Sequence, residues 1–337
     1  MAGPSRSVSQ CRLVACSTAG EILDTHVFDD SLVCTAIEFE RSSIAVATAQ
    51  LDESSDCAML GALLTSRLPR AGLAHVFVLS DGIKVNGSAL VAGIVKSLPA
   101  DVGVTGGLAG DGARFEQTAV CVDGPRPRQQ IAAIGFYGSG LRIGYGSLGG
   151  WDSFGVERRI TRAAGNVLYE LDGEPALDLY KRYLGEHARS LPASGLLFPL
   201  SIRSGSADMT PVVRTILSID ERARTMTFAG DVPVDYRARL MRANFERLLD
   251  GASGAALATQ DRLGQHSPEL AILISCVGRK LVLRQRIEEE VEAVRDVLGP
   301  ITCLSGFYSY GEISPFTPSA RCELHNQTMT ITTLSES

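Results

Sequence analysis

The chain has 337 residues, of which 45% are hydrophobic and 21% charged, the composition of an ordinary globular protein long enough for two or three domain-sized units. Its formal net charge of -6 leaves no basic surplus to hold phosphates, so we expect no nucleic-acid partner. No segment approaches the roughly 18–20 apolar residues of a membrane span, so we expect no membrane insertion.

The first half of the chain predicts strands interrupted by two helices. In residues 11–50 we expect three strands, the last two joined as a hairpin: CRLVACS (11–17), SLVCTAIEFE (31–40) and SIAVATAQL (43–51). A helix is predicted over 55–68, because its leucines share one face, and Pro69 ends it. Next we expect a buried strand at 75–82, a helix at 87–98, a Gly-rich strand at 102–110, and strands within 115–124 and 129–138.

Residues 135–150, GFYGSGLRIGYGSLGG, look superficially like a phosphate-binding loop. The dinucleotide pattern requires G-x-G-x-x-G between a strand and a helix. Here Gly138-Ser139-Gly140 is followed by Leu-Arg-Ile-Gly, which fails that spacing. We therefore predict a hairpin and no nucleotide at this segment.

The second half of the chain begins with a change in the hydrophobic pattern of the sequence. Residues 157–190 have helical spacing, so we place a domain boundary near 151–157 and divide the chain into units 1–153 and 154–337. Strands are predicted at 196–204, 212–220, 225–233, 269–280, 300–314 and 322–334. We expect Asp235 to cap a helix through about residue 250, and a further helix after 280 that Gly299-Pro300 ends.

An internal repeat runs through the chain. Apolar strands lead into the steps Gly20-Glu21, Gly110-Asp111 and Gly311-Glu312, and the last two are preceded by a buried strand and a helix. Only ten residues precede the first copy, so we expect its first strand and helix to be missing, with homodimerisation favoured at the sheet edge left open. We also expect the three turns to converge on one pocket.

The N-terminal MAGPSRSVSQ has no apolar run long enough for a signal peptide, so we expect a cytoplasmic protein. Cysteines in that compartment stay reduced. Five of the eight cysteines lie in apolar stretches and are interpreted as small buried thiols: Cys16, Cys34, Cys121, Cys276 and Cys303. There is no Cys-x-x-Cys pair or H-E-x-x-H motif, so no metal site is expected.

Several motifs together resemble the FIST family of sensory domains. They are ACSTAGEI (15–22), HVFVLSDG (75–82), VGVTGGLAGDG (102–112), FAGDVP (228–233), LMRANFERLLDGA (240–252), ISCVGRKLVL (274–283), SGFYSYGEISP (305–315) and CELHNQTMTITTL (322–334). The resemblance implies an α/β fold of two FIST units, built from repeated strand–helix–strand–strand elements, with mixed β-sheets flanked by helices.

The same resemblance implies an intracellular sensor that binds a small ligand, with amino-acid-like molecules the usual proposal. We expect a non-catalytic sensor of a small polar ligand, with an amidohydrolase as the alternative if the protein is an enzyme. Some members are haemoproteins that sense nitric oxide and regulate a histidine kinase. This sequence carries no fused kinase or cyclase, so the signal is expected to pass to a separate protein such as a histidine kinase.

Tyr308, Tyr310 and Glu312 alternate, which on one strand would place two phenols and a carboxylate on one face. Such a set suits a ligand with a cationic group, through charge and cation–π contact. The alternative is a core strand whose tyrosines pack and hydrogen-bond. The full predicted ligand set is Ser17, Thr18, Glu21, Gly110, Asp111, Arg214, Tyr308, Tyr310, Glu312, His325, Asn326 and Gln327, with Arg214 placed to pair with a ligand carboxylate.

Two other functions remain open. His325 is the best haem-ligand candidate, ahead of His26 and His75, although a single strand histidine is more often structural. A hydrolase of cyclic amides would use a serine activated by a lysine, and Ser80 with Lys84 or Ser275 with Lys280 stand at equivalent strand ends. The alternative there is turn-forming serines beside solvated lysines.

Overall fold

The computed structural model describes residues 11–52, 55–124, 129–191, 193–205, 211–263, 266–315 and 321–337. Over these residues the chain is a mixed α/β protein, as predicted, and its strands form two six-stranded sheets, one eight-stranded sheet and one two-stranded pair. In the same ranges, no helix combines the length and apolarity needed to cross a membrane.

The two six-stranded sheets have matching topologies. One has the order β21–β20–β6–β5–β8–β4, with bounds Cys322–His325, Gly311–Pro315, Gly103–Leu108, Leu73–Ser80, Gln130–Tyr137 and Ser43–Gln50. The other has the order β3–β2–β19–β18–β22–β9, with bounds His26–Phe28, Glu21–Leu23, Cys303–Ser309, Leu270–Cys276, Met329–Glu336 and Leu141–Leu148. In each, a central parallel pair, β5–β6 or β18–β19, lies among antiparallel neighbours. The internal repeat predicted from the sequence therefore corresponds to two equivalent sheets.

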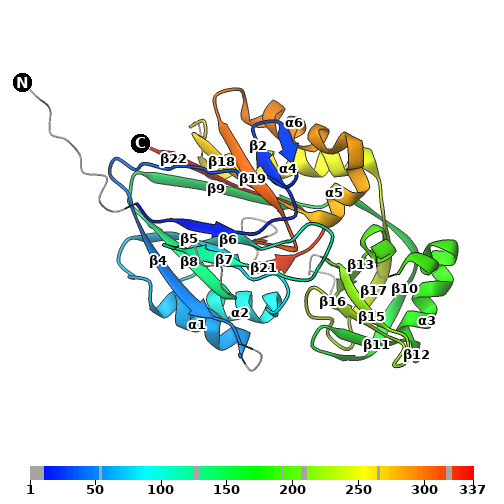
Figure 1. Ribbon diagram of the computed structural model, residues 1–337. Helices are drawn as coiled ribbons and strands as arrows, with labels where there is room; N and C mark the ends of the chain where they lie inside the picture. The colour runs from blue at the N-terminus through cyan, green and yellow to red at the C-terminus, as the bar shows by residue number, and fades with distance from the viewer. Residues whose placement is uncertain are drawn as a thin grey trace, which may run out of the picture.

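Helices cover the outer faces of these sheets (Figure 1). Helices α1 (Cys57–Ser66) and α2 (Gly87–Ser97) lie beside the first sheet, and α4 (Phe245–Leu263), α5 (Val277–Leu283) and α6 (Ile287–Leu298) lie beside the second. Glycine is needed where α1 crosses α2, because a Cβ atom on Gly93 would lie 2.0 Å from the backbone oxygen of Ala58. The Asp56 carboxylate caps α1 by accepting the N–H group of Ala58 over 2.9 Å.

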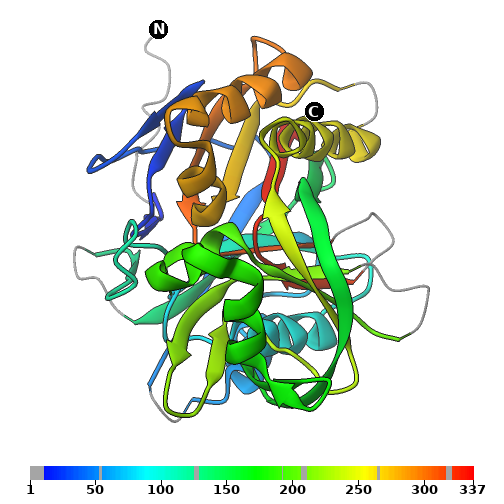
Figure 2. The same ribbon diagram turned by 90° about the vertical axis from the view of Figure 1, so that its right-hand side faces the viewer.

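The third part of the fold has a core of its own, built around Leu168, Tyr180 and Phe228. Its strands are β10 (Trp151–Ala164), β11 (Val167–Leu171), β12 (Glu174–Pro175), β13 (Leu200–Arg203), β14 (Val212–Arg214), β15 (Ile216–Asp220), β16 (Thr225–Phe228) and β17 (Arg237–Ala243). Helix α3 (Ala176–Leu184) packs on it, and Figure 2 shows the long strands β10 and β17 extending from it toward the rest of the molecule. Short 3-10 turns occupy Gly185–Ser190, Ala193–Leu197 and Arg284–Arg286.

Three predicted elements are wrong. Residues 157–172 belong to β10 and β11 and are not helical. Exposed and partly buried side chains alternate along β10, because successive side chains of a strand point to opposite faces. Residues 237–243 form β17, and the helix predicted from Asp235 begins at Phe245. Residues 31–40 form no strand, and Cys34 within them is exposed, as is Cys303, although both were predicted to be buried.

Three further predictions joined residues that the fold separates. Residues 135–150 are no hairpin, since β8 and β9 pair in different sheets. The last predicted strand is split into β21 and β22, again in different sheets, at a turn where Gln327 has φ +65°. Likewise β19 ends at Ser309 and β20 begins at Gly311, so Tyr308 and Glu312 do not share the face of one strand.

Candidate ligand-binding site

The three Gly-acid turns lie against one another. Backbone hydrogen bonds join them, from Gly110 to Ser17 over 3.0 Å, from Gly112 to Thr18 over 3.2 Å, from Ala19 to Tyr308 over 2.8 Å and from Tyr310 to Leu108 over 3.3 Å. The ends of β6 and β19 and the turn before β2 therefore meet at one junction.

The acidic side chains of these turns are used inside the protein. Glu21 accepts hydrogen bonds from Thr18 and Ser31, Asp111 from Tyr310 and from the backbone of residues 115–117, and Glu312 from Ser309 and Thr328. Burial acts to raise the pKa of Asp111, but its hydrogen bonds from Gln117 and Tyr310 outweigh burial and lower it. The junction of the three turns holds strand ends together. Its carboxylates already accept hydrogen bonds from donors within the protein.

Tyr308 belongs to a separate buried cluster. Its hydroxyl donates to Glu290 over 2.9 Å, and the hydroxyl of Ser275 donates to the same carboxylate over 3.1 Å. Arg279 pairs with Glu290, and both side chains are fully buried. Lys280 instead donates to the backbone oxygen of Ala19 over 2.9 Å. Ser275 is therefore bonded to a carboxylate and not to the lysine predicted to activate it.

The other predicted serine–lysine pair is not formed either. The Ser80 hydroxyl is buried and makes no hydrogen bond within the described part of the chain, whereas Lys84 is exposed.

Residues 325–327 join the C-terminal segment to the eight-stranded sheet. Asn326 accepts the N–H group of Thr215 over 3.4 Å, and Gln327 donates to the hydroxyl of Thr215 over 3.0 Å. His325 Nε2 donates to the backbone oxygen of Ser314 over 2.8 Å, and burial lowers the pKa of this ring to about 4. All three side chains are buried in contacts with the protein.

The histidine environments do not fit a haem. His325 would have to give up its hydrogen bond and its burial to reach an iron. His75 is likewise buried, with Nε2 2.8 Å from the Thr105 hydroxyl, and exposed His26 pairs with Glu288. None of these rings lines the pocket described next.

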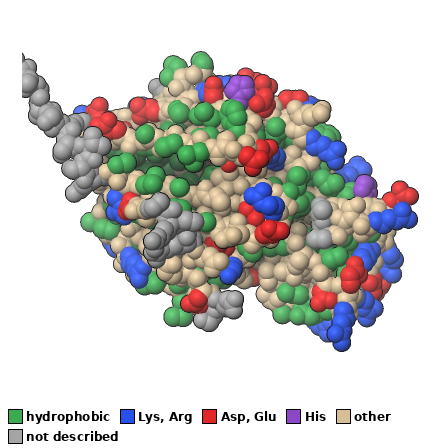
Figure 3. Space-filling model, viewed as in Figure 1, with side chains coloured by type: hydrophobic (Ala, Val, Ile, Leu, Met, Phe, Trp, Pro, Cys, Tyr) green, Lys and Arg blue, Asp and Glu red, His purple; other side chains and the backbone are tan. Residues whose placement is uncertain are grey.

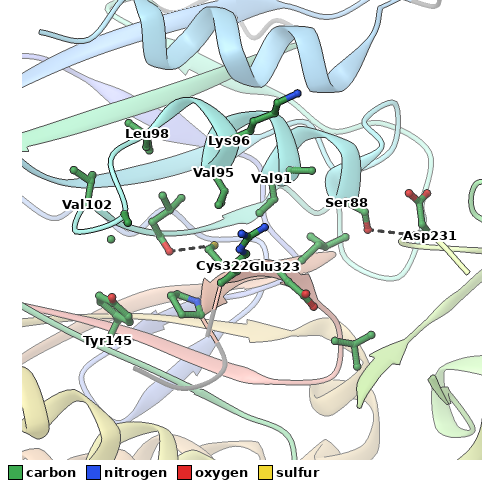
Figure 4. Close-up of a pocket in the computed structure, with 18 of the residues that line it drawn as sticks. Ser88, Val91, Val95, Lys96, Leu98, Val102, Tyr145, Asp231, Cys322 and Glu323 are labelled. Carbon is green, nitrogen blue, oxygen red and sulfur yellow. Dashed lines mark hydrogen bonds between the residues drawn. The ribbon is translucent and has the colours of Figure 1, made fainter. Parts of the chain in front are cut away.

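A pocket of about 1180 Å³ opens between α2, β21 and the eight-stranded sheet (Figure 4). Val91 and Val95 of α2 line one wall, and Ile202 and Val212 come from the eight-stranded sheet. Leu324 of β21 is a further apolar part of the lining. Charged side chains also line it: Lys96, Asp101, Arg203, Arg214, Asp231, Arg321 and Glu323. An apolar wall with a few polar groups is the usual construction of a small-molecule site.

Arg214 is the buried cation of this pocket, with only 6% of its surface exposed. Its Nε donates to the backbone oxygen of Asp231 over 3.0 Å and its Nη1 to that of Leu324 over 3.0 Å. Nη2 has no hydrogen bond to any described residue. Burial lowers the pKa of Arg214 to about 10, against the opposing effect of Glu323 and Asp231, so the side chain stays charged at neutral pH.

Glu323 and Gly230 complete the surroundings of Arg214. The half-buried Glu323 carboxylate forms no hydrogen bond or ion pair with the residues that the structure describes. A Cβ atom on Gly230 would lie 3.0 Å from Arg214 Nε and 2.8 Å from the Ser88 hydroxyl, so a glycine leaves room for the guanidinium there. The Ser88 hydroxyl in turn accepts the N–H group of Asp231 over 3.2 Å (Figure 4).

Of the twelve predicted ligand residues, the pocket includes only Arg214. The others lie at the turn junction, in the Tyr308 cluster or in the 325–327 segment. Sequence reasoning missed Glu323 and Asp231 as site residues, although both lie in motifs that carry the family resemblance, CELHNQ and FAGDVP. Both residues are far from α2 in the sequence, so no local pattern indicates that they share a pocket with it.

Comparison with family models matches residues 4–174 to the FIST N domain and residues 176–315 to the FIST C domain. The chain belongs to the FIST family. FIST domains are sensory domains of signal transduction, so the sequence resemblance is confirmed at that level. Comparison with proteins of curated function finds no match.

Among solved structures, this FIST protein is similar to the crystal structure of cyanuric acid hydrolase from A. caulinodans. Identity is 11%, and the match covers 88% of this chain and 99% of the hydrolase. The TM-score is 0.20, too low to support any argument about fold or activity.

Proposed function

We propose that this FIST protein is a non-catalytic sensor that binds a small amino-acid-like ligand in the pocket beside Arg214. It would pass the signal to a separate protein such as a histidine kinase. The observation that carries the proposal is a buried guanidinium with one amino group left without an acceptor among the described residues, in a pocket that also holds the Glu323 carboxylate, to which no described residue donates a hydrogen bond.

The two charges complement a zwitterion. A ligand carboxylate would accept from Arg214 Nη2, and a ligand ammonium group would pair with Glu323. Arginine is suited to this role because the Arg214 guanidinium is held by the backbone oxygens of Asp231, Val213 and Leu324 and is oriented before the ligand arrives. Val91 and Val95 would then contact the ligand's apolar portion.

The position of the pocket suits a sensor. Its lining comes from α2 in the first part of the chain, from β13 and β14 in the middle, and from β21 near the end. A ligand that contacts all three would favour one arrangement of these elements over others, by its differential affinity.

Thermal shift with the twenty amino acids tests the proposal. We expect one or more to raise the melting temperature, by an amount that grows with the logarithm of its concentration above Kd, by mass action. Glu323→Gln keeps the shape of the side chain and removes its charge, so it should weaken that ligand about tenfold or more. Arg247→Gln, at an exposed arginine paired with Asp152, is the control and should bind normally. Equal binding by parent and Glu323→Gln would refute this site.

The haem and hydrolase alternatives find less support. The first predicts a Soret band in protein expressed with haem supply and its loss in His325→Ala. The second predicts turnover of a cyclic amide that Ser80→Ala or Ser275→Ala abolishes. Either result would displace the present proposal.

A further inference from the structure

The pocket beside Arg214 extends along helix α2. Residues that are three or four positions apart share one face of a helix, and four lining residues of α2 have that spacing: Ser88, Val91, Ala92 and Val95. At a rise of about 1.5 Å per residue, Ser88 and Val95 are about 10 Å apart along the helix axis. The wall that α2 contributes therefore begins with a hydroxyl group and continues as an apolar stripe.

Polar groups gather at the Ser88 end of this wall. The Ser88 hydroxyl accepts the N–H group of Asp231 over 3.2 Å, and Arg214 Nε donates to the backbone oxygen of Asp231 over 3.0 Å. Burial lowers the pKa of Arg214, and the Glu323 carboxylate acts in the opposite direction, so the two charges lie within electrostatic range of each other. The Asp231 carboxylate already accepts Nδ2 of Asn86 over 2.9 Å. Arg214 and Glu323 are therefore the charges that this end presents to a ligand.

The opposite end of the pocket is aromatic and apolar. Tyr145 and Val102 lie there, on the far side of the pocket from Ser88 (Figure 4). The Tyr145 ring packs against His75, with ring centroids 5.7 Å apart. A Cβ atom on Gly103 would lie 2.8 Å from Cε1 of Tyr145, so the ring occupies this place because residue 103 is a glycine.

Strand β21 connects the two ends. The backbone oxygen of Leu324 accepts Nη1 of Arg214 over 3.0 Å at the charged end. Two residues earlier, the Cys322 thiol donates to the backbone oxygen of Val104 over 3.3 Å, beside the segment that contributes Val102. Two residues of a strand span about 7 Å. The helix and the strand therefore agree that roughly 7–10 Å separate the charged end from the apolar end.

The other charged residues of the lining lie at the rim or are paired. Lys96 is exposed and directs its ammonium group away from the cavity (Figure 4), and Asp101 and Arg321 are exposed as well. Charged side chains of both signs are interspersed over the part of the molecule that carries the eight-stranded sheet (Figure 3). Arg203 belongs to that part and forms two hydrogen bonds of 2.9 Å with Glu157.

We propose that the ligand of this pocket is an α-amino acid with an aromatic side chain. The inference rests on the proposed function and specifies the class of ligand for the same site. The carboxylate and ammonium groups bind Arg214 and Glu323 at one end. The side chain lies along the apolar stripe of α2 and directs its ring toward Tyr145, because aromatic rings attract one another in edge-to-face and offset arrangements.

The size of the pocket favours a large side chain over a small one. Its volume of about 1180 Å³ exceeds the range of roughly 300–1,000 Å³ that is usual for small-molecule sites. Alanine bound at Arg214 leaves Val95 in contact with water, whereas an aromatic side chain covers it. The apolar area removed from water is then the main difference in binding free energy between the two ligands.

Isothermal titration of the full chain with alanine, leucine, phenylalanine and tryptophan tests the inference. We expect at least one of the two aromatic amino acids to bind about 10- to 100-fold more tightly than alanine, because it buries a large apolar side chain. The same amino acid should bind about two- to tenfold more tightly than leucine, because the aromatic pair with Tyr145 adds to the effect of burial.

Two substitutions in the apolar stripe test its role. Ala92→Phe fills the space beside an exposed helix residue, and Val95→Asp places a charge there. Each should reduce the preference for the aromatic amino acid over alanine at least tenfold. Ala223→Phe, at an exposed residue in the turn before β16, is the control and should keep the preference of the parent.

The outcomes separate this inference from the proposed function. If no amino acid binds the parent, both fail. If amino acids bind and Glu323→Gln weakens them, but alanine or leucine binds as tightly as the aromatic amino acids, only the present inference fails. It also fails if Ala92→Phe and Val95→Asp both retain the preference of the parent.

Discussion

Glu312 and His325 stand directly opposite each other in the antiparallel β20–β21 pair, yet their side chains bond to different partners. Glu312 accepts from Ser309 over 2.6 Å and from the Thr328 hydroxyl over 3.0 Å, while His325 donates to the Ser314 backbone oxygen. Both are buried, and burial shifts the pKa of each toward its neutral form. The two residues therefore make opposite contributions to the pH dependence of stability.

Burial raises the pKa of Glu312 to about 8 from the ordinary value of 4.5, despite hydrogen bonds from Ser309 and Thr328. The folded state then holds a proton that the unfolded state releases, so stability falls as pH rises from about 4.5 to 8. Glu312→Gln should flatten this part of the profile, by a few kcal/mol at most at about 1.4 kcal/mol per pKa unit. Urea unfolding at pH 5, 6.5 and 8 measures it, and an unchanged slope would contradict the assignment.

His325 affects the stability of the protein at acidic pH. Its pKa of about 4 in the folded state lies below the ordinary 6.5, so the unfolded state binds the proton first as pH falls. Stability should be unaffected above pH 6.5 and should decline between about 6.5 and 4. His325→Gln should remove part of that decline. The replacement of exposed His187 by Gln is the control and should leave the profile unchanged.

Removal of one partner of the buried pair of Arg279 and Glu290 should be strongly destabilising. Arg279 also donates to the Leu248 backbone oxygen over 2.7 Å, and Glu290 accepts from Tyr308 and Ser275. Glu290→Gln leaves a buried guanidinium without its counter-charge, which typically costs about 3–5 kcal/mol.

The neighbouring residue offers a matched control for that change. Glu289 pairs with Arg286 over 2.6 Å at the surface, where ion pairs contribute about 0–1 kcal/mol. Glu289→Gln should therefore have little effect in urea unfolding. Equal effects of the two substitutions would contradict the expected cost of leaving Arg279 buried without its counter-charge.

The sequence predicted those elements whose signals are local. The strands β5 and β18 are continuous apolar runs, and the helices α2 and α6 after them were predicted, so both parallel units were recognised. Residues 277–280, predicted as strand, instead belong to α5, which lies between β18 and α6. The strands β10 and β17 were missed because each is stabilised by long-range pairing, from Trp151 with Ala243 to Arg159 with Arg237, and no local pattern encodes that register. Segment 31–40 has the composition of a strand but pairs with no strand among the described residues.

The candidate site was harder to predict for a related reason. Arg214, Val91 and Glu323 come from three distant parts of the chain, and only the fold brings them to one pocket. Conversely, the dense polar segment 308–327 suggested a site because buried hydrogen-bonding residues and ligand-binding residues are of the same types. The Asn326 and Gln327 side chains instead form hydrogen bonds with backbone and hydroxyl groups of the protein.

Gly230 provides a test of the pocket that leaves every charge in place. A Cβ atom there would approach Arg214 Cζ to 3.1 Å and the Ser88 hydroxyl to 2.8 Å. The serine can rotate, whereas the guanidinium is held by the backbone oxygens of Asp231 and Leu324. Gly230→Ala should therefore displace the guanidinium and weaken an amino-acid-like ligand about tenfold, with a loss of stability of about 1–3 kcal/mol.

Isothermal titration with the ligand found by thermal shift measures this effect. Gly124→Ala is the matched control, because the nearest atom to its added Cβ would be 3.9 Å away, in ordinary contact. It should bind as the parent does. Unchanged affinity in Gly230→Ala, with its stability lowered as expected, would show that the position of the Arg214 guanidinium does not matter to the ligand. The carboxylate anchor would then have to be sought at Arg203 or Arg321, the other arginines of the pocket.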